Sequence, residues 1–267
     1  MKKNIILSFI LLICILLFIV LTPIAVRTIK VHACSDDCVD SILKFQQNNE
    51  ETVFSIDKIT YFSSCNAKGD TNSNSSFSIS DLYQYTDIAI FLNPVSEPLT
   101  KKNTLKSVTI SDIFYEITPS IGEQALYYKS LSDFAKAQFS EDNIITESIT
   151  FETTSDSSID YSKPVLYNNC ANPITLCYIN SKLKDKYTFS NDISNLTYNG
   201  SLLKMCGITL SSLNCQIGLT ITITNNLDEI YSCPLILNIP LSSESNTIYD
   251  GNLTIKDSVN YKFIRTY

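Results

Sequence analysis

The sequence predicts an α+β fold that is mostly β: an N-terminal transmembrane helix followed by a disulfide-stabilised ectodomain with an antiparallel, sandwich-like carboxy-terminal half. Three observations predict it: an uncharged run of 22 residues near the amino terminus, eight cysteines after that run, and alternating apolar stretches toward the carboxy terminus. The chain has 267 residues, 44% of them hydrophobic, which is enough to bury a sizeable core. We divide it into an anchor and stem (1–30), a mixed α/β part of the ectodomain (31–152) and an antiparallel β part (165–267).

The uncharged run, residues 5–26, has the length of a membrane span. A helix rises about 1.5 Å per residue, so these 22 residues reach about 33 Å, slightly more than the hydrocarbon layer of a bilayer. A cleaved signal peptide has a shorter apolar centre, so the length favours a retained anchor with the lipid bilayer as its partner. The alternative is a secreted factor cleaved after Ala33, because residues 31–33 form a small-residue cleavage pattern.

Eight cysteines beyond the span favour an extracytoplasmic location for the rest of the chain. Their even number is what full pairing requires, and disulfides persist outside the cytoplasm. The disulfide candidates are Cys34, Cys38, Cys65, Cys170, Cys177, Cys206, Cys215 and Cys233. The first three precede residue 152 and the other five follow residue 165, so full pairing needs at least one bond between the two parts. The individual pairs stay open, and eight reduced thiols in the cytosol are the alternative.

Charge sets the orientation and excludes one class of partner. Lys2 and Lys3 at the amino terminus oppose Arg27 and Lys30 after the span, which slightly favours a cytoplasmic amino terminus and a single-pass topology. Beyond the stem, 16 basic residues face 27 acidic residues. Nucleic-acid binding depends mainly on lysine and arginine that neutralise phosphates, so we expect no nucleic-acid partner.

We predict no catalytic residue, no metal site and no cofactor. The sequence has no C-x-x-C pair, and its one histidine, His32, lies beside the predicted span. It also lacks G-x-S-x-G, H-E-x-x-H and a phosphate-binding glycine loop. Paired carboxylates need no local motif, so a membrane-tethered carboxylate-based hydrolase is the alternative function. Possible glycosylation sites are Asn74, Asn195, Asn199 and Asn252, a number that the composition yields by chance.

The first elements of the ectodomain are predicted as helix, loop and strand. Residues 34–50 form a short helix, because Ser35 can cap it and apolar residues follow on one side. The polar stretch Ser63–Ser80 is predicted to be an exposed loop. The stretch Tyr83–Leu92 becomes apolar, with the run Ile88–Leu92, and ends at Pro94, which predicts a buried strand.

A helix is predicted next, and strands follow. Ser120 and Glu123 form a capping box, and apolar residues recur up to Glu141, which predicts a core helix that covers a sheet. Residues Ile217–Thr224 alternate between apolar side chains and threonine, the pattern of a half-buried antiparallel strand. A turn at Asn225-Asn226 and a partner strand follow, and the end of the chain also alternates. The partner residues are Leu235, Leu237 and Ile239, and the last alternating stretch is Leu253–Tyr267.

Tyrosine is the residue type that best suits a contact surface. The 15 tyrosines include the clusters Tyr83/Tyr85, Tyr127/Tyr128 and Tyr261/Tyr267. Tyrosine gives large, stiff contact area at interfaces, but it also forms strands well and packs at the edge of cores. For any single tyrosine we favour the structural role.

These features together predict a non-enzymatic, membrane-anchored surface or envelope ectodomain that acts by protein–protein contact. The anchor and the cysteine pattern resemble those of amino-terminally anchored envelope proteins of large DNA viruses. Examples are subunits of poxvirus-type entry–fusion complexes and baculovirus per os infectivity factors. The resemblance covers the architecture alone, so it implies a viral envelope or entry component and assigns no functional residue.

Overall fold

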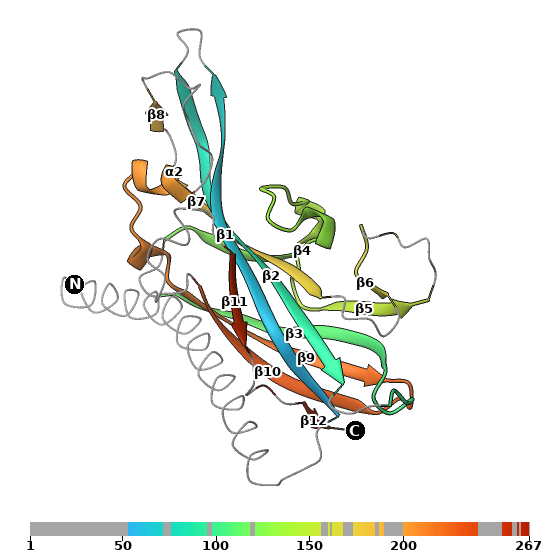
Figure 1. The fold of residues 1–267 in the computed structure, drawn as a ribbon. Helices are drawn as coiled ribbons and strands as arrows, with labels where there is room; N and C mark the ends of the chain where they lie inside the picture. Colours follow the sequence, from blue (N-terminus) through green and yellow to red (C-terminus); the bar gives the residue numbers. More distant parts are fainter. Residues whose placement is uncertain are drawn as a thin grey trace, which may run out of the picture. The chain divides into compact units, whose positions relative to one another are not determined.

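The computed structural model describes residues 53–71, 76–94, 98–117, 121–155, 160, 162–167, 173–184, 187–189, 200–239, 253–257, 261 and 263–266. These residues are mostly β, which confirms the predicted β-rich class (Figure 1). The predicted span over residues 5–26 and the predicted helix over residues 34–50 lie outside them. Within the described ranges, no helix has the length and apolar character needed to cross a bilayer.

Twelve strands and several short helical turns make up this part of the chain. The strands are β1 (Phe54–Thr71), β2 (Phe77–Pro94), β3 (Leu105–Ile117), β4 (Glu123–Tyr128), β5 (Ile149–Thr154), β6 (Val165–Tyr167), β7 (Ile174–Lys184), β8 (Tyr187–Phe189), β9 (Cys215–Asn225), β10 (Ile230–Ile239), β11 (Leu253–Asp257) and β12 (Ile264–Arg265). The helices are η1 (Leu131–Asp133), η2 (Glu141–Asn143), α2 (Gly200–Met205) and η4 (Leu210–Leu213).

The strands form two sheets. Sheet A has the order β11-β1-β2-β7-β4, and β8 pairs with the first three residues of β2. Sheet B has the order β12-β10-β9-β3-β5-β6. All pairs are antiparallel except β5 with β6. Each sheet contains strands from both the first and the last parts of the chain, so the carboxy-terminal strands do not form a sheet of their own.

The two sheets pack face to face because each presents an apolar face to the other. Aromatic rings meet between the sheets: Phe54 of β1 lies edge-on to Tyr231 of β10, with ring centroids 5.4 Å apart. Inward residues from both sheets form one apolar core. Its largest fully buried members include Tyr178, Tyr231, Phe54, Phe151, Phe263, Ile88, Ile90 and Ile110.

The clearest prediction for the carboxy-terminal half is confirmed residue by residue. In β9, Ile221 and Ile223 point into the core, and the threonine between them faces outward. The chain turns after Asn225, and β10 returns along β9 with Leu235 opposite Leu219. The predicted buried strand over Tyr83–Leu92 is also confirmed, since it lies inside β2.

The predicted exposed loop over Ser63–Ser80 is wrong for the described residues of that stretch. They belong to the long β1–β2 hairpin, where Ser63 pairs with Thr86 and Asp70 pairs with Ser78. Polar residues are stable in these strands because the backbone groups of β1 and β2 pair with each other. A second apolar cluster also packs on the hairpin, formed by Cys65, Phe77, Ile79, Leu82, Leu183, Leu202, Leu203, Cys206 and Leu213.

The predicted core helix over Ser120–Glu141 is wrong. Residues 123–128 form β4, which pairs with β7 along its whole length, and Leu126 and Tyr128 point into the core. The chain then follows an irregular path with only the short turns η1 and η2. Ala135 has a φ of +64°, which a helix does not allow. Strand pairing over residues 123–128 therefore outweighed the local helix signals.

Candidate functional site

Serine and threonine side chains cover a continuous area on the outer face of sheet B. Inward positions of β3 and β9 hold apolar residues such as Val108 and Ile221, so the alternate positions point outward. Eight partly or fully exposed Ser and Thr residues lie at these outward positions: Ser107, Thr109, Ser111, Thr150, Thr220, Thr222, Thr224 and Ser232. We call this surface the hydroxyl face.

Four of these hydroxyl residues form a row across four neighbouring strands. Thr109 of β3 is opposite Thr150 of β5 on one side and Thr222 of β9 on the other, and Thr222 is opposite Ser232 of β10. The hydroxyl oxygens of Thr109 and Thr150 are 2.9 Å apart, and those of Thr222 and Ser232 are 3.2 Å apart. Hydrogen bonds between neighbours therefore restrict the rotamers of the row.

Larger side chains lie beside the row. Beyond a bulge in β3, the ring of Phe114 lies over Gly218, so closely that a Cβ added at Gly218 would be 1.9 Å from the ring. Charged residues lie outside the row: Glu152 neighbours Ser107. The hydroxyl face thus has an uncharged centre and a charged margin.

The outer face of sheet A is different, because the segment between β4 and β5 covers it. Asp87 of β2 and Lys129, directly after β4, form an ion pair in which both side chains are almost completely buried. The Lys129 ammonium donates hydrogen bonds to both carboxylate oxygens, at 2.8 and 2.7 Å, and to the carbonyl oxygen of Lys136. The Ala135 amide also donates to Asp87, at 2.7 Å. One buried carboxylate therefore holds both ends of the turn 129–136.

Burial decides the protonation behaviour of this cluster. Desolvation raises the pKa of Asp87 above its usual value, although Lys129 opposes the shift. The Cys177 thiol lies against Asp87, and its pKa is raised well above the ordinary value by complete burial and by that carboxylate. The Lys129 ammonium also lies 5.3 Å from the centre of the Tyr85 ring. The Asp87 carboxylate and the Lys129 ammonium have their hydrogen-bond partners within this cluster. The cluster therefore fixes the segment between β4 and β5 to the outer face of sheet A.

A third polar cluster forms the β9–β10 turn. Asn225 is completely buried, and its amide donates to the Lys102 carbonyl and to Glu229, both at 2.8 Å. The Tyr231 hydroxyl donates to the same carboxylate at 2.8 Å, and Arg265 pairs with it at 2.8 Å. These donors, Tyr231 first, lower the pKa of Glu229. Asn225 appeared in the sequence only as a turn residue, and its place at the centre of this network was not predicted.

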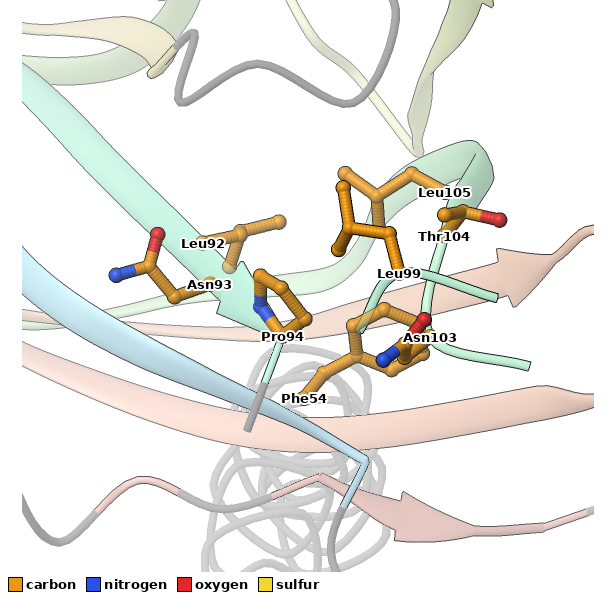
Figure 2. Close-up of a pocket in the computed structure, with 8 residues that line it drawn as sticks. All are labelled: Phe54, Leu92, Asn93, Pro94, Leu99, Asn103, Thr104 and Leu105. Carbon is orange, nitrogen blue, oxygen red and sulfur yellow. The ribbon is translucent and has the colours of Figure 1, made fainter. Parts of the chain in front are cut away.

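A small pocket lies between the end of β2 and the start of β3 (Figure 2). Its lining residues are Phe54, Leu92, Asn93, Pro94, Leu99, Asn103, Thr104 and Leu105. The space is about 10 Å³, about what one water molecule needs, so it is too small for an organic ligand. Within the described ranges, no group of three His, Cys, Asp or Glu side chains is arranged to hold a metal ion.

Five of the eight predicted disulfide cysteines fall in the described part of the chain, and no disulfide joins them there. All five are buried: Cys65, Cys177, Cys206, Cys215 and Cys233. They are spread over three apolar clusters, which separates most of them from one another. Disulfide stabilisation is therefore not seen among these residues. Cys34, Cys38 and Cys170 lie outside the described ranges, as do the possible glycosylation sites Asn74, Asn195, Asn199 and Asn252.

The tyrosines are mainly structural, as favoured from the sequence. Tyr83 and Tyr85 lie under the covering segment, and burial raises the pKa of each to about 12. The Tyr83 ring packs edge-on against Phe139. Tyr128 lies in the core, Tyr127 is half-buried and Tyr267 is outside the described part of the chain.

No family model, no curated protein and no solved structure matches this chain.

Proposed function

We propose that this chain is a single-pass, membrane-anchored surface or envelope ectodomain that acts by protein–protein contact, with the hydroxyl face as its contact surface. Residues 5–26 anchor it in the lipid bilayer, the amino terminus lies in the cytoplasm, and residues 31–267 lie beyond the membrane. The row Thr150–Thr109–Thr222–Ser232 carries the proposal, because it places hydroxyl groups in fixed register over four strands.

Physical properties of the row favour a contact role. Charged residues are depleted at the centres of interfaces, where their desolvation is costly, and the row has no charged member. Threonine and serine lose little side-chain entropy when a partner covers them, and those in the row are already restricted by one another. In each hydrogen-bonded pair one hydroxyl keeps its O–H donor for a partner, and every hydroxyl keeps acceptor capacity.

Photo-crosslinking of the full-length chain in its membrane tests the contact surface. A photoreactive amino acid at Thr222 is expected to yield one reproducible protein adduct, and a lysine at Thr109 is expected to abolish that adduct by placing a charge in the interface. The matched control places the photoreactive residue at Thr146, an exposed position in the β4–β5 segment. Equal labelling at both positions, or none at Thr222 in the folded chain, would overturn the contact surface.

Protease protection tests the topology separately. In sealed cells or particles that display the chain, protease added outside is expected to digest residues 31–267 and leave a short membrane-protected fragment that contains residues 5–26. Digestion of the large part only after the membrane is opened would place it in the cytoplasm and overturn the proposed location.

A further inference from the structure

Two of the buried cysteines share one cluster on the β1–β2 hairpin. Cys65 of β1 is fully buried, and Cys206, which directly follows α2, is 5% exposed. Helix α2 packs against β1, and its Leu202 and Leu203 belong to the same apolar cluster as Cys65. Cys65 therefore lies in the cluster formed by the short helix whose end carries Cys206.

The other three described cysteines lie elsewhere. Cys65 is opposite Gln84 of β2, whereas Cys177 is opposite Asp87, so the two cysteines are on opposite faces of sheet A. Cys215 and Cys233 both belong to the core between the sheets and not to the hairpin cluster. Cys215 is opposite Ile239 and Cys233 is opposite Ile221, so these two cysteines are six residues apart along the paired strands β9 and β10. Cys65 and Cys206 are the remaining pair that shares a cluster among these five cysteines.

We propose that Cys65 and Cys206 form a disulfide bond that fastens α2 to the β1–β2 hairpin. The proposal rests on the proposed function, because a stable disulfide needs the oxidising side of the membrane. It also supplies a bond between the two parts of the ectodomain, which full pairing of three and five cysteines requires.

The reaction is a thiol–disulfide exchange with an external disulfide, either oxidised glutathione or an oxidoreductase. Each thiol gives up its hydrogen, the two Sγ atoms join, and the two electrons pass to the external disulfide, whose S–S bond breaks to give two thiols. Burial raises the pKa of both cysteines, to about 12 for Cys65, and nearby Lys184 opposes the shift at Cys206. Cys206 is the more exposed of the two, so exchange starts there, and Cys65 then attacks the mixed disulfide.

Peptide mapping of the full chain in its membrane tests the pair. Thiols are blocked with N-ethylmaleimide before lysis, and the protein is then digested without reductant and analysed by mass spectrometry. We expect a linked peptide pair that contains Cys65 and Cys206. The matched variant Cys177→Ser is expected to keep that pair, and Cys65→Ser is expected to leave Cys206 blocked by maleimide. A bond from Cys65 or Cys206 to another cysteine, or either residue blocked while others are paired, overturns the proposal.

A second experiment separates this proposal from the proposed location. If all eight cysteines are blocked in the membrane sample, the oxidising location is wrong. The purified full chain is then reoxidised in a buffer of reduced and oxidised glutathione and mapped again. The Cys65–Cys206 peptide pair in that sample supports the geometric assignment, and any other pairing, or two thiols at these positions, overturns it.

Discussion

The Lys129 ammonium lies 2.8 and 2.7 Å from the two carboxylate oxygens of Asp87, and the side chains are 3% and 0% exposed. A buried ion pair of this kind is costly to assemble but more costly to break on one side. It fastens the segment that covers Tyr83 and Tyr85 on the outer face of sheet A.

Substitution of Asp87 by asparagine should therefore destabilise the fold strongly. Lys129 would keep its positive charge in a buried site without a counter-ion, which costs about 3–5 kcal/mol. Urea unfolding of the detergent-solubilised chain, followed by tyrosine fluorescence, measures this loss. The double variant D87L/K129M removes both charges and is expected to recover most of the stability. A loss below about 1 kcal/mol for Asp87→Asn would show that Lys129 finds water in the folded state.

Acid should weaken the β9–β10 turn through Glu229. The Tyr231 hydroxyl and the Asn225 amide lower its pKa below 4.5, so the folded state favours the charged carboxylate. Its contribution is therefore complete above the unfolded pKa and is lost as the pH falls through the lowered folded pKa. The thermal midpoint of the wild type should fall more steeply between about pH 5 and pH 3 than that of Glu229→Gln. Tyr231→Phe removes the leading donor and should reduce the difference, whereas parallel curves for all three proteins would refute this account.

Gly122 and Gly207 give a matched pair for backbone strain. Both have positive φ, +77° and +76°, but a Cβ at Gly122 would lie 2.1 Å from the Asn180 side-chain oxygen and 2.6 Å from a backbone oxygen. A Cβ at Gly207 meets nothing within 4 Å. We expect Gly207→Ala to cost about 1 kcal/mol and Gly122→Ala about 2–4 kcal/mol in free energy of unfolding. Equal losses would mean that β4 moves away from β7 without cost.

Reductant should destabilise the oxidised chain if Cys65 and Cys206 are joined. The bond would close a loop of more than half the chain, for which chain entropy predicts about 4–5 kcal/mol. Unfolding midpoints with and without dithiothreitol measure the effect. The Cys65→Ser variant should show no response to dithiothreitol at this site, and an equal response in both proteins would assign the stabilisation to another bond.

The sequence predicted strands well where period-two alternation was strong and neighbours followed closely. The β9–β10 hairpin meets both conditions, because Ile221 and Ile223 alternate with threonines and the turn lies next in the chain. The prediction failed over residues 123–128, where a local capping box competed with pairing to β7, about 50 residues later in the chain. The sequence around residues 123–128 contains no signal for pairing with a strand that far along the chain.

The candidate site was harder to predict for the same reason. The alternating threonines of β9 indicated a solvent-facing side, but the row needs Thr109 and Thr150 from strands far earlier in the chain. Asp87 and Lys129 showed no pattern of their own, because an ion pair is defined only once β2 and the end of β4 come together. Long-range topology therefore decided both features.

The β1–β2 hairpin contributes to all three apolar clusters. Tyr61 and Ile88 lie in the core between the sheets, Cys65 and Leu82 lie in the cluster that includes α2 residues, and Tyr83 lies under the segment between β4 and β5. Its two strands stay paired along their whole length, interrupted only by two register shifts. Main-chain pairing thus runs from Thr71 and Phe77 at one end of the two strands to the centre of sheet A. We therefore expect the apolar clusters that the hairpin joins to unfold together rather than one after the other.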